Sequence, residues 1–172
     1  MTIRSMPCAL RAGLAALLFA VLPHTTALAD KIEVTDLAGR TVQVERGASR
    51  IVLGEGRMIY SIALLDRDNP FKRVVGWKDD LIKYDPDAWR KYETFFPQAR
   101  GLTNLGSPYD AEYSLETVVA LNADLVIMNL GDLLKAQESG ILTKLEKAGI
   151  PSIFIDFRQN PTENTVPSML LL

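Results

Sequence analysis

Cysteine and histidine are almost missing from this sequence. The 172 residues include one of each, Cys8 and His24, and both precede residue 25. The rest of the chain therefore excludes disulfide bonds, cysteine or histidine nucleophiles, and zinc or copper sites built on thiolate or imidazole ligands. It also excludes Ser-His-Asp and Cys-His catalytic arrangements. Any chemistry in that part must use carboxylates, lysine, arginine, tyrosine or the backbone.

An excess of charge of either sign is missing as well. The sequence has 19 lysines and arginines against 21 aspartates and glutamates, which gives a net charge of −2. A nucleic-acid partner would require a clustered basic surface, so this balance predicts none. With 48% apolar and 23% charged residues, the composition is that of a globular protein, and the length allows one globular unit.

Residues 1–29 are typical of a secretory signal peptide. Arg4 and Arg11 are the only charged residues before Asp30. Segment 12–22 is almost wholly apolar but too short to cross a bilayer, and residues 27–29 form the small-x-small pattern of a cleavage site. A buried N-terminal helix is the alternative interpretation. We expect export and cleavage just before Asp30, which would remove two arginines and lower the net charge from −2 to −4.

The hydrophobic pattern then alternates between strand and helix. Two alternating segments flank a turn at Gly39, which predicts a β-hairpin over residues 30–49. Beyond it, apolar runs predict parallel strands and helical spacing predicts the helices between them. The expected strands are 51–53, 73–77, 124–128 and 152–156, and the expected helices are 57–65, 88–96, 115–121 and 132–147. This order predicts an α/β lobe over residues 50–160, with a parallel sheet flanked by helices.

Single residues predict where three of these helices begin or are interrupted. Asp85 and Ser114 are expected to cap the helices that follow them, since their side chains can accept hydrogen bonds from free N–H groups of the first turn. Gly140 is expected to interrupt the helical segment 132–147. Residues 161–172 are expected to begin one more helix.

Ligands of open α/β sheets bind outside the carboxyl ends of the strands. That rule selects the loops 54–58, 77–84, 106–109, 129–132 and 156–160. These loops carry, among others, the cationic and aromatic residues Arg57, Trp77, Lys78, Lys83, Tyr109 and Arg158. None of these loops contains a catalytic motif.

Four segments together resemble one family. VTDLAGRTVQV (34–44) with RIVLG (50–54), SLETVVALNADLVIM (114–128), LEKAGIPSIFID (145–156) and NPTENTVPSMLLL (160–172) occur in the order and spacing of the periplasmic iron-siderophore and vitamin B12 binding proteins. The resemblance extends from the predicted hairpin to the end of the chain. One departure is Ala123, which stands before Asp124 where the family usually has proline.

The resemblance implies a substrate-binding protein of an ABC importer, located in the periplasm and without enzymatic activity. Such proteins have two α/β lobes joined by a long helix, and the ligand lies between the lobes. This chain is similar to the N-terminal lobe and to the start of the bridging helix at 161–172. The expected ligand is a ferric siderophore, with haem or cobalamin as the alternative, and the expected partner is a membrane permease. No resident cofactor is expected.

We expect the ligand to contact Arg57, Trp77, Lys78, Tyr109 and Arg158. Each has a structural alternative. Arg57 can be a solvated arginine, and the two aromatic residues can cover the edge of the sheet. Lys78 and Lys83 can pair with the neighbouring acids Asp79 and Asp80, and Arg158 can pair with Asp156.

Glu116 corresponds to a glutamate that docks on permease arginines in the family. Alternatively, an acid in the first turn of a helix simply complements the helix dipole.

Two other classes of function remain open at this point. A small secreted α/β enzyme could use paired carboxylates, and the acidic loop residues available for it are Asp79, Asp80, Asp110 and Glu112. A module that binds only another protein is the third possibility.

Overall fold

The computed structural model describes residues 30–172, so the predicted signal peptide and its cleavage site lie outside the described residues. The described part opens with an antiparallel hairpin of β1 (Lys31–Thr35) and β2 (Thr41–Glu45), in which Val34 pairs with Val42. The valines and isoleucine of this hairpin face inward while its polar residues face solvent, as the alternating pattern predicts.

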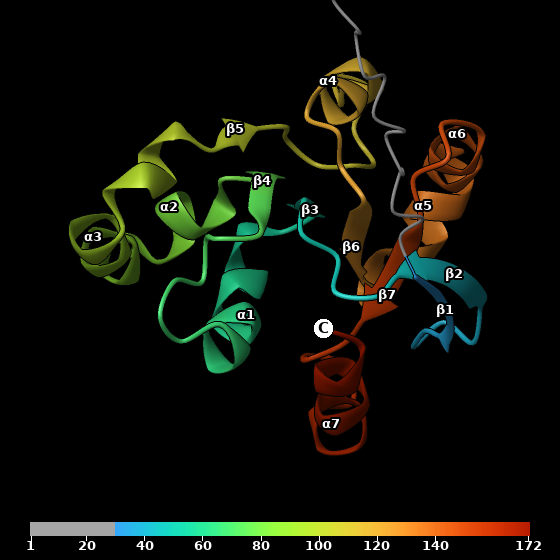
Figure 1. Ribbon diagram of the computed structural model, residues 1–172, viewed down its shortest axis with the longest axis horizontal. Coiled ribbons are helices and arrows are strands. Elements are labelled where there is room, and N and C mark those ends of the chain that lie inside the picture. The colour runs from blue at the N-terminus through green and yellow to red at the C-terminus, as the bar shows by residue number, and fades with distance from the viewer. Residues whose placement is uncertain (1–29) are drawn as a thin grey trace, which may run out of the picture.

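A five-stranded, wholly parallel sheet forms the centre of the molecule (Figure 1). Its strands lie in the order β5-β4-β3-β6-β7. They are β3 (Ile51–Leu53), β4 (Val74–Trp77), β5 (Thr103–Asn104), β6 (Leu125–Asn129) and β7 (Ser152–Ile155). The predicted fold class, a parallel sheet flanked by helices and preceded by a hairpin, is confirmed.

Helices and short 3₁₀ turns connect the strands. The α-helices are α1 (Ile59–Leu65), α2 (Asp80–Tyr84), α3 (Pro86–Phe95), α4 (Leu115–Ala120), α5 (Leu133–Glu138), α6 (Ile141–Lys147) and α7 (Pro161–Leu171). The 3₁₀ turns are η1 (Gly56–Met58), η2 (Pro97–Gly101) and η3 (Leu130–Asp132). In the described residues no helix is both long enough and apolar enough to cross a membrane.

The predicted capping and breaking residues behave as expected. The side chain of Asp85 accepts from the backbone N–H of Ala88, and that of Ser114 accepts from Thr117. Gly140 separates α5 from α6 with a φ of 68°, a conformation that glycine adopts without steric cost. The short helix α2 and the two-residue strand β5 were not predicted, because each is too short to show a hydrophobic period.

Alternate residues of the strands belong to two hydrophobic clusters, one on each face of the sheet. Ile51, Leu53 and Ile127 pack with α1, α2, α3 and the end of α7 on one face. Val52 and Val126 pack with α4, α5 and α6 on the other. Burial on both faces explains the nearly continuous apolar sequence of these strands.

The turn of the hairpin protects the free edge of β7. The backbone N–H of Leu37 donates to the carbonyl of Phe154, and the N–H of Phe154 donates to the carboxylate of Asp36 at 3.1 Å. Arg40 pairs with Asp36 and also donates to the carbonyl of Ser152. This covering satisfies edge groups that would otherwise be open to another strand.

The strand order reverses between β3 and β6. From β3 the chain adds β4 and then β5 on one side, and it returns to add β6 and β7 on the other. The loops after β3 and β6 therefore leave in opposite directions and open a crevice at the carboxyl ends of the strands. This position is where the candidate site is expected.

Candidate functional site

A cavity of about 520 Å³ lies at this reversal of strand order. Its lining comes from the loops after β3, β4, β5 and β6 and from α5. The lining residues are Gly54, Glu55, Lys78, Ser107, Tyr109, Asp110, Asp132, Lys135, Glu138 and Ser139. The sequence rule selects this same edge of the sheet, and of the five predicted ligand contacts Lys78 and Tyr109 line this cavity.

Arg57 lies beside the cavity and is held by a buried acid. The Asp80 side chain is 3% exposed, and one of its oxygens accepts from Nε of Arg57 at 2.6 Å. Its other oxygen accepts from the backbone N–H of Gly56 at 2.5 Å. The alternative pairing of Asp80 with a neighbouring lysine is thus replaced by a pairing with Arg57. The carboxylate fixes one side of the guanidinium and leaves the rest partly exposed.

Arg158 is held in a similar way by Glu55. The carboxylate of Glu55, only 7% exposed as a residue, accepts from the Arg158 guanidinium across the ends of β3 and β7. The alternative, an ion pair between the Arg158 guanidinium and Asp156, is wrong. The Asp156 carboxylate accepts a hydrogen bond from the backbone N–H of Arg158 instead. Partial burial lowers the pKa of Arg158 from its ordinary value. The group stays charged because that ordinary value is so high.

Trp77 does not reach the cavity. The residue is 2% exposed. Its ring packs edge-on against Phe71, with ring centroids 6.0 Å apart, and at a tilt against Trp89, with centroids 5.4 Å apart. Strand alternation turns the indole into the core beneath α2 and α3, so the proposed stacking of Trp77 on a ligand does not fit its position. Its structural alternative, covering the edge of the sheet, does not describe it either, because the indole belongs to the hydrophobic core.

Tyr109 follows β5 and packs against the second hydrophobic cluster while lining the cavity. Its hydroxyl and that of Tyr113 are buried without a hydrogen-bond partner among residues 30–172. Burial raises the pKa of both hydroxyls, so they are neutral donors at physiological pH.

The carboxylates of the alternative enzyme do not form one group. Asp80 is buried under Arg57, while Asp110 and Glu112 are exposed residues between β5 and α4. Within residues 30–172 no group of three or more acidic, cysteine or histidine side chains is arranged to hold a metal ion. The arrangement does not favour carboxylate catalysis.

Glu116 is exposed in the first turn of α4, and its carboxylate accepts from the hydroxyl of Ser114 at 3.3 Å. This position is open to a partner and also close to the positive end of the helix. Both predicted roles of Glu116 are compatible with it.

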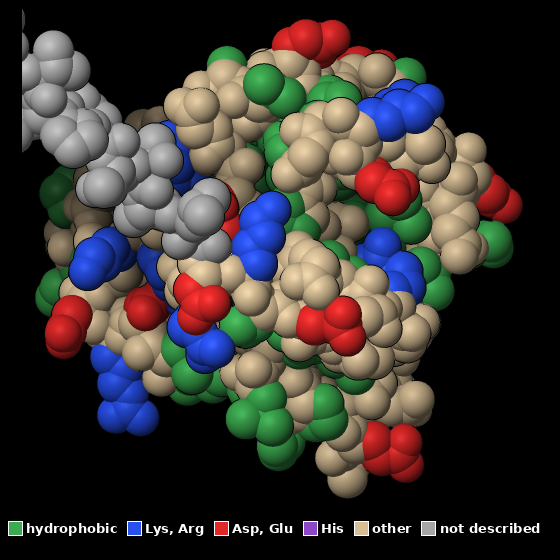
Figure 2. Space-filling view, turned by 45° about the vertical axis from the view of Figure 1, so that its right-hand side comes forward, with side chains coloured by type: hydrophobic (Ala, Val, Ile, Leu, Met, Phe, Trp, Pro, Cys, Tyr) green, Lys and Arg blue, Asp and Glu red, His purple; other side chains and the backbone are tan. Residues whose placement is uncertain are grey.

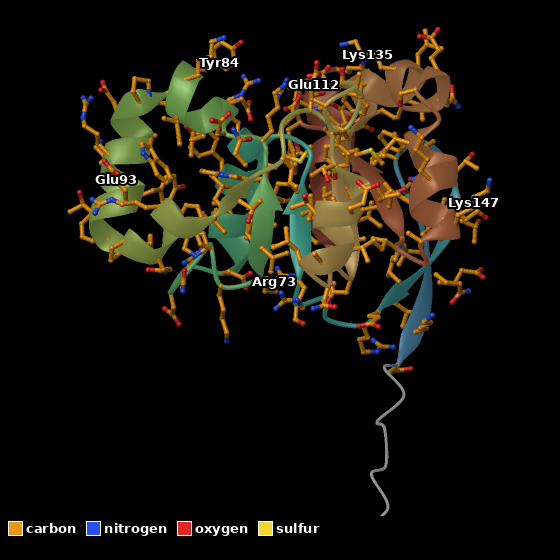
Figure 3. The ribbon with its side chains drawn as sticks, turned by 90° about the horizontal axis from the view of Figure 1, so that it is seen from above. Arg73, Tyr84, Glu93, Glu112, Lys135 and Lys147 are labelled. Atoms are coloured by element: carbon orange, nitrogen blue, oxygen red, sulfur yellow. The ribbon has the colours of Figure 1, made fainter. Side chains whose placement is uncertain are left out.

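Sequence reasoning missed two contributors to this edge. Glu55 gave no signal beyond its place between two glycines after β3, and Tyr84 belongs to the unpredicted helix α2. Figure 3 shows Tyr84 on the same edge as Glu112 and Lys135, with Arg73 at the opposite edge.

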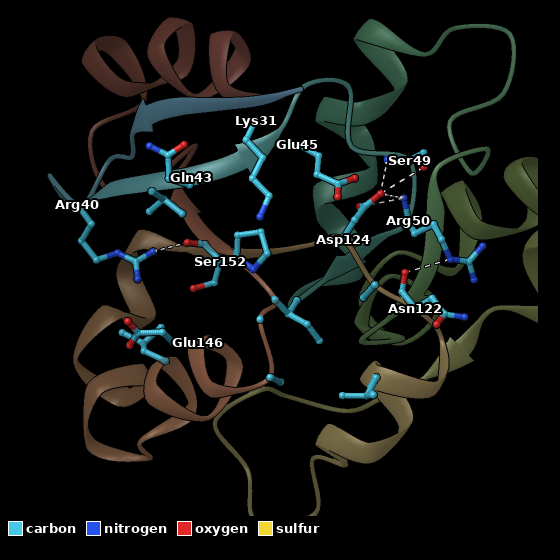
Figure 4. A pocket seen from close by; sticks show the side chains of 18 of the residues that line it. Lys31, Arg40, Gln43, Glu45, Ser49, Arg50, Asn122, Asp124, Glu146 and Ser152 are labelled. Atoms are coloured by element: carbon cyan, nitrogen blue, oxygen red, sulfur yellow. Dashed lines mark hydrogen bonds between the residues drawn. The ribbon is translucent and has the colours of Figure 1, made fainter. Parts of the chain in front are cut away.

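A larger cavity, of about 870 Å³, lies at that opposite edge between the hairpin and the starts of the strands (Figure 4). Asp124 accepts there from the backbone N–H groups of Ser49 and Arg50, and the Arg50 side chain donates to the carbonyls of Leu121 and Asn122. These contacts hold together the two segments that lead into β3 and β6. We favour the smaller cavity as the functional site because ligands of parallel sheets bind at the carboxyl ends of strands.

The structure is similar to solved periplasmic binding proteins. The TroA-like periplasmic binding protein FepB from Veillonella parvula is 31% identical, with a TM-score of 0.71 over 80% of this chain and 40% of that protein. A periplasmic solute-binding protein from the same species is 23% identical, with a TM-score of 0.54, over 81% of this chain and 40% of that one. MolA from Haemophilus influenzae, a molybdate periplasmic binding protein of an ABC transporter, is 16% identical, with a TM-score of 0.59. The match covers 80% of this chain and 43% of MolA.

No protein-family model matches the chain, and no curated protein matches it. The structural likeness nevertheless confirms the resemblance seen in the sequence: the chain is similar to TroA-like periplasmic binding proteins and has their fold. More particularly, it has the α/β architecture found in FepB and spans about 40% of that protein's length.

Proposed function

We propose that this chain is the N-terminal, ligand-binding lobe of a periplasmic binding protein that delivers a metal chelate, most specifically a ferric siderophore, to an ABC permease. The observation that carries the proposal is the pair of arginines at the carboxyl edge of the sheet. Arg57 and Arg158 are oriented by the buried carboxylates of Asp80 and Glu55. A preorganised guanidinium contacts an anionic ligand with little loss of side-chain entropy.

The donor chemistry of the chain supports a chelate rather than a bare metal ion. From residue 30 onward there is neither histidine nor cysteine. Ferric iron prefers oxygen ligands, and a siderophore brings its own, so the protein needs to recognise only the outside of the complex. Haem and cobalamin could contact a similar set of cationic and aromatic side chains, and they are the alternative ligands within this function.

The structural relatives bear on this choice of ligand. MolA is described with molybdate bound and CeuE of Helicobacter pylori with Ni(II). The fold thus serves unlike ligands, and the side chains at the edge must decide which one binds.

Equilibrium dialysis of the purified chain against ferric siderophores, haem, cobalamin and molybdate tests the proposal. We expect a ferric siderophore to bind and Arg57→Gln to weaken it about fivefold or more, since an Arg–anion contact is lost. Arg67→Gln is the matched control, because it removes the same charge from an exposed arginine between α1 and β4. Because one lobe alone is expected to bind weakly, the dialysis extends to chelate concentrations far above micromolar; if no metal chelate binds the unaltered chain even there, the proposed function is wrong.

The remaining parts of the proposal concern delivery. Export through the predicted signal peptide would place the chain in the periplasm, and Glu116 would meet the permease. In this proposal α7 is the start of the helix that leads to a second lobe. The protein relatives support this reading because they are periplasmic and are longer than this chain.

A further inference from the structure

The outer edge of β2, the edge that does not face β1, is open. At the end of the hairpin the N–H of Asp36 donates to the carbonyl of Arg40, so these two residues form a hydrogen-bonded pair. Hydrogen-bonded and non-hydrogen-bonded pairs alternate along an antiparallel ladder. The pairs that contain Thr41, Gln43 and Glu45 are therefore of the second kind, and the backbone N–H and C=O groups of these three residues point away from β1.

This open edge forms one wall of the cavity of about 870 Å³ at the amino ends of the strands (Figure 4). Its opposite wall is the connection from α6 to β7. No backbone hydrogen bond joins Thr41, Gln43 or Glu45 to another segment within residues 30–172. The edge of β7 is covered by the turn of the hairpin, whereas β2 keeps a row of donors and acceptors that a further strand can use.

Most charges that line this cavity are engaged. Arg40 pairs with an aspartate of the turn, Arg50 donates to backbone carbonyls, and Asp124 accepts from backbone N–H groups. The other charged residues of the lining, which have no ion pair within residues 30–172, are Lys31, Glu45 and Glu146.

The balance of these groups is negative. Two carboxylates stand against one ammonium group, and α6 ends at the cavity, where the carbonyl end of a helix adds partial negative charge. A basic occupant therefore complements the cavity, and an acidic one is repelled.

We infer that β2 accepts an extended, basic peptide segment of a partner protein, which adds to the open edge as a third strand of the hairpin. Main-chain hydrogen bonds to Thr41, Gln43 and Glu45 supply affinity that does not depend on the peptide sequence. Lysine or arginine side chains of the peptide meet Glu45 and Glu146, which supplies the preference for basic segments. The inference goes beyond the proposed function, because this cavity lies at the opposite edge of the sheet from the loops assigned to the metal chelate.

Three peptides test the two parts of the inference. The probe has five residues, the length of β2, with lysine alternating with valine and a dye on its N-terminus. In the second peptide glutamate replaces lysine, and in the third every backbone nitrogen of the probe is methylated, which removes the N–H donors and keeps the side chains. Binding to the purified chain is measured by fluorescence anisotropy. We expect the second and third peptides to bind at least about tenfold more weakly than the probe.

A pair of proline variants tests the edge itself. Gln43→Pro removes an outward N–H of β2 but no hydrogen bond of the ladder. Glu33→Pro is the matched control, because Glu33 pairs with Gln43 in the register and its N–H points to the outer edge of β1. Both substitutions remove the same hydrogen bond of 2.9 Å between the two side chains. We expect Gln43→Pro to weaken the lysine peptide at least about fivefold and Glu33→Pro to leave it unchanged.

A second pair of variants decides the matter if proline unfolds the hairpin, which circular dichroism melting would show. Glu146→Gln should weaken the lysine peptide about threefold, because one carboxylate of the cavity is lost. Glu112→Gln removes an exposed acid at the opposite edge of the sheet (Figure 3) and should bind like the unaltered chain.

Four results would overturn the inference. It is wrong if the lysine peptide does not bind, if the methylated or the acidic peptide binds equally well, or if each variant behaves like its control. It is also wrong if sedimentation shows a dimer that Gln43→Pro abolishes and the lysine peptide leaves intact, because the edge then pairs with a second copy of the chain. None of these results affects the proposed function, which dialysis against metal chelates decides.

Discussion

At the scale of single residues, the site depends on two loops that touch. The backbone of Gly56, after β3, lies against the loop after β4, where a Cβ atom on Gly56 would be 2.3 Å from the carbonyl oxygen of Lys78. The same close approach lets the Gly56 N–H reach the carboxylate of Asp80. A missing side chain is therefore what allows Asp80 to hold both this loop and Arg57.

Gly56→Ala should separate these loops. The new methyl group meets backbone rather than a flexible side chain, so we expect a loss of about 2 kcal/mol in the free energy of unfolding. We also expect weaker binding of a ferric siderophore, because Arg57 loses its support. Urea denaturation and equilibrium dialysis measure the two effects.

Gly101→Ala provides the control, since nothing lies within 4 Å of its added Cβ. It should change stability by a few tenths of a kcal/mol at most. Equal stability of the two variants would show that the contact between the loops is not tight.

Glu116 has a separate role at the same scale. Glu116→Ala should leave siderophore affinity nearly unchanged but impair uptake in cells that carry the complete transport system, because its proposed partner is the permease. Its loss from the helix dipole should cost only about 0.5 kcal/mol. Ligand affinity is measured by dialysis and uptake with radioactive iron.

Glu163→Ala is the matched variant, because Glu163 is also an exposed acid in the first turn of a helix. It should not change uptake. The docking role would be contradicted if Glu116→Ala lost its affinity for the ligand and if this loss alone explained the reduced uptake.

At the scale of elements, the junction of β7 with α7 is held by a group of hydrogen bonds around Asp156. The Asp156 carboxylate accepts from the backbone N–H groups of Arg158, Gln159 and Asn160 and from the side chain of Asn164. The buried hydroxyl of Ser168 accepts from the Asp156 N–H and donates to the Asp156 carbonyl. These bonds fix the direction in which α7 leaves the sheet.

This junction should make stability dependent on pH. Burial raises the pKa of Asp156, but the hydrogen bonds outweigh it and lower the pKa from 3.8 to about 2. A depressed carboxyl pKa contributes stability that is complete above the unfolded value and is lost as pH falls through the folded value. We therefore expect Asp156 to contribute about 2 kcal/mol above pH 4, decreasing toward pH 2.

Asp156→Asn should remove this contribution. The variant should be less stable than the unaltered chain at pH 7, and the difference should shrink as pH falls from about 4 to 2. Asp87→Asn, at an acid whose side chain is 78% exposed, should follow the unaltered chain. Urea denaturation at several pH values is the measurement, and a difference that does not vary with pH would refute the assignment.

At the scale of the whole molecule, the proposed function makes this chain one of two lobes that contact the ligand. Concave sites bury most of a small ligand, and the proposed binding protein would enclose it between two lobes. On the face seen in Figure 2, acidic, basic and apolar side chains are interspersed, and Leu170 of α7 remains 83% exposed. Part of this surface would be covered in a longer protein.

We therefore predict that residues 30–172 alone bind a ferric siderophore weakly. Loss of about half of the ligand contacts, equivalent to about 4 kcal/mol, reduces affinity about a thousandfold. Calorimetry on the purified chain measures the affinity, and sedimentation shows whether exposed apolar residues such as Leu170 cause self-association. A submicromolar, one-to-one complex with a monomer would show that a single lobe suffices.

The sequence by itself determined the class of the fold and the edge of the sheet at which the candidate loops meet. Apolar strand runs such as 125–129, the capping residues Asp85 and Ser114, and the break at Gly140 are local signals. The order of the strands, by contrast, became known only from the structure. Because parallel strands end at one edge, the loops with Arg57, Lys78 and Tyr109 were placed correctly.

Tertiary structure alone decided which side chains face that edge and what they contact. Trp77 and Lys78 are neighbours in sequence, yet strand alternation buries the first and exposes the second to the cavity. The partners of the two arginines, Asp80 and Glu55, are 23 and 103 residues away from them. No local pattern encodes such pairs, because packing of the whole sheet, rather than sequence spacing, brings the loops together.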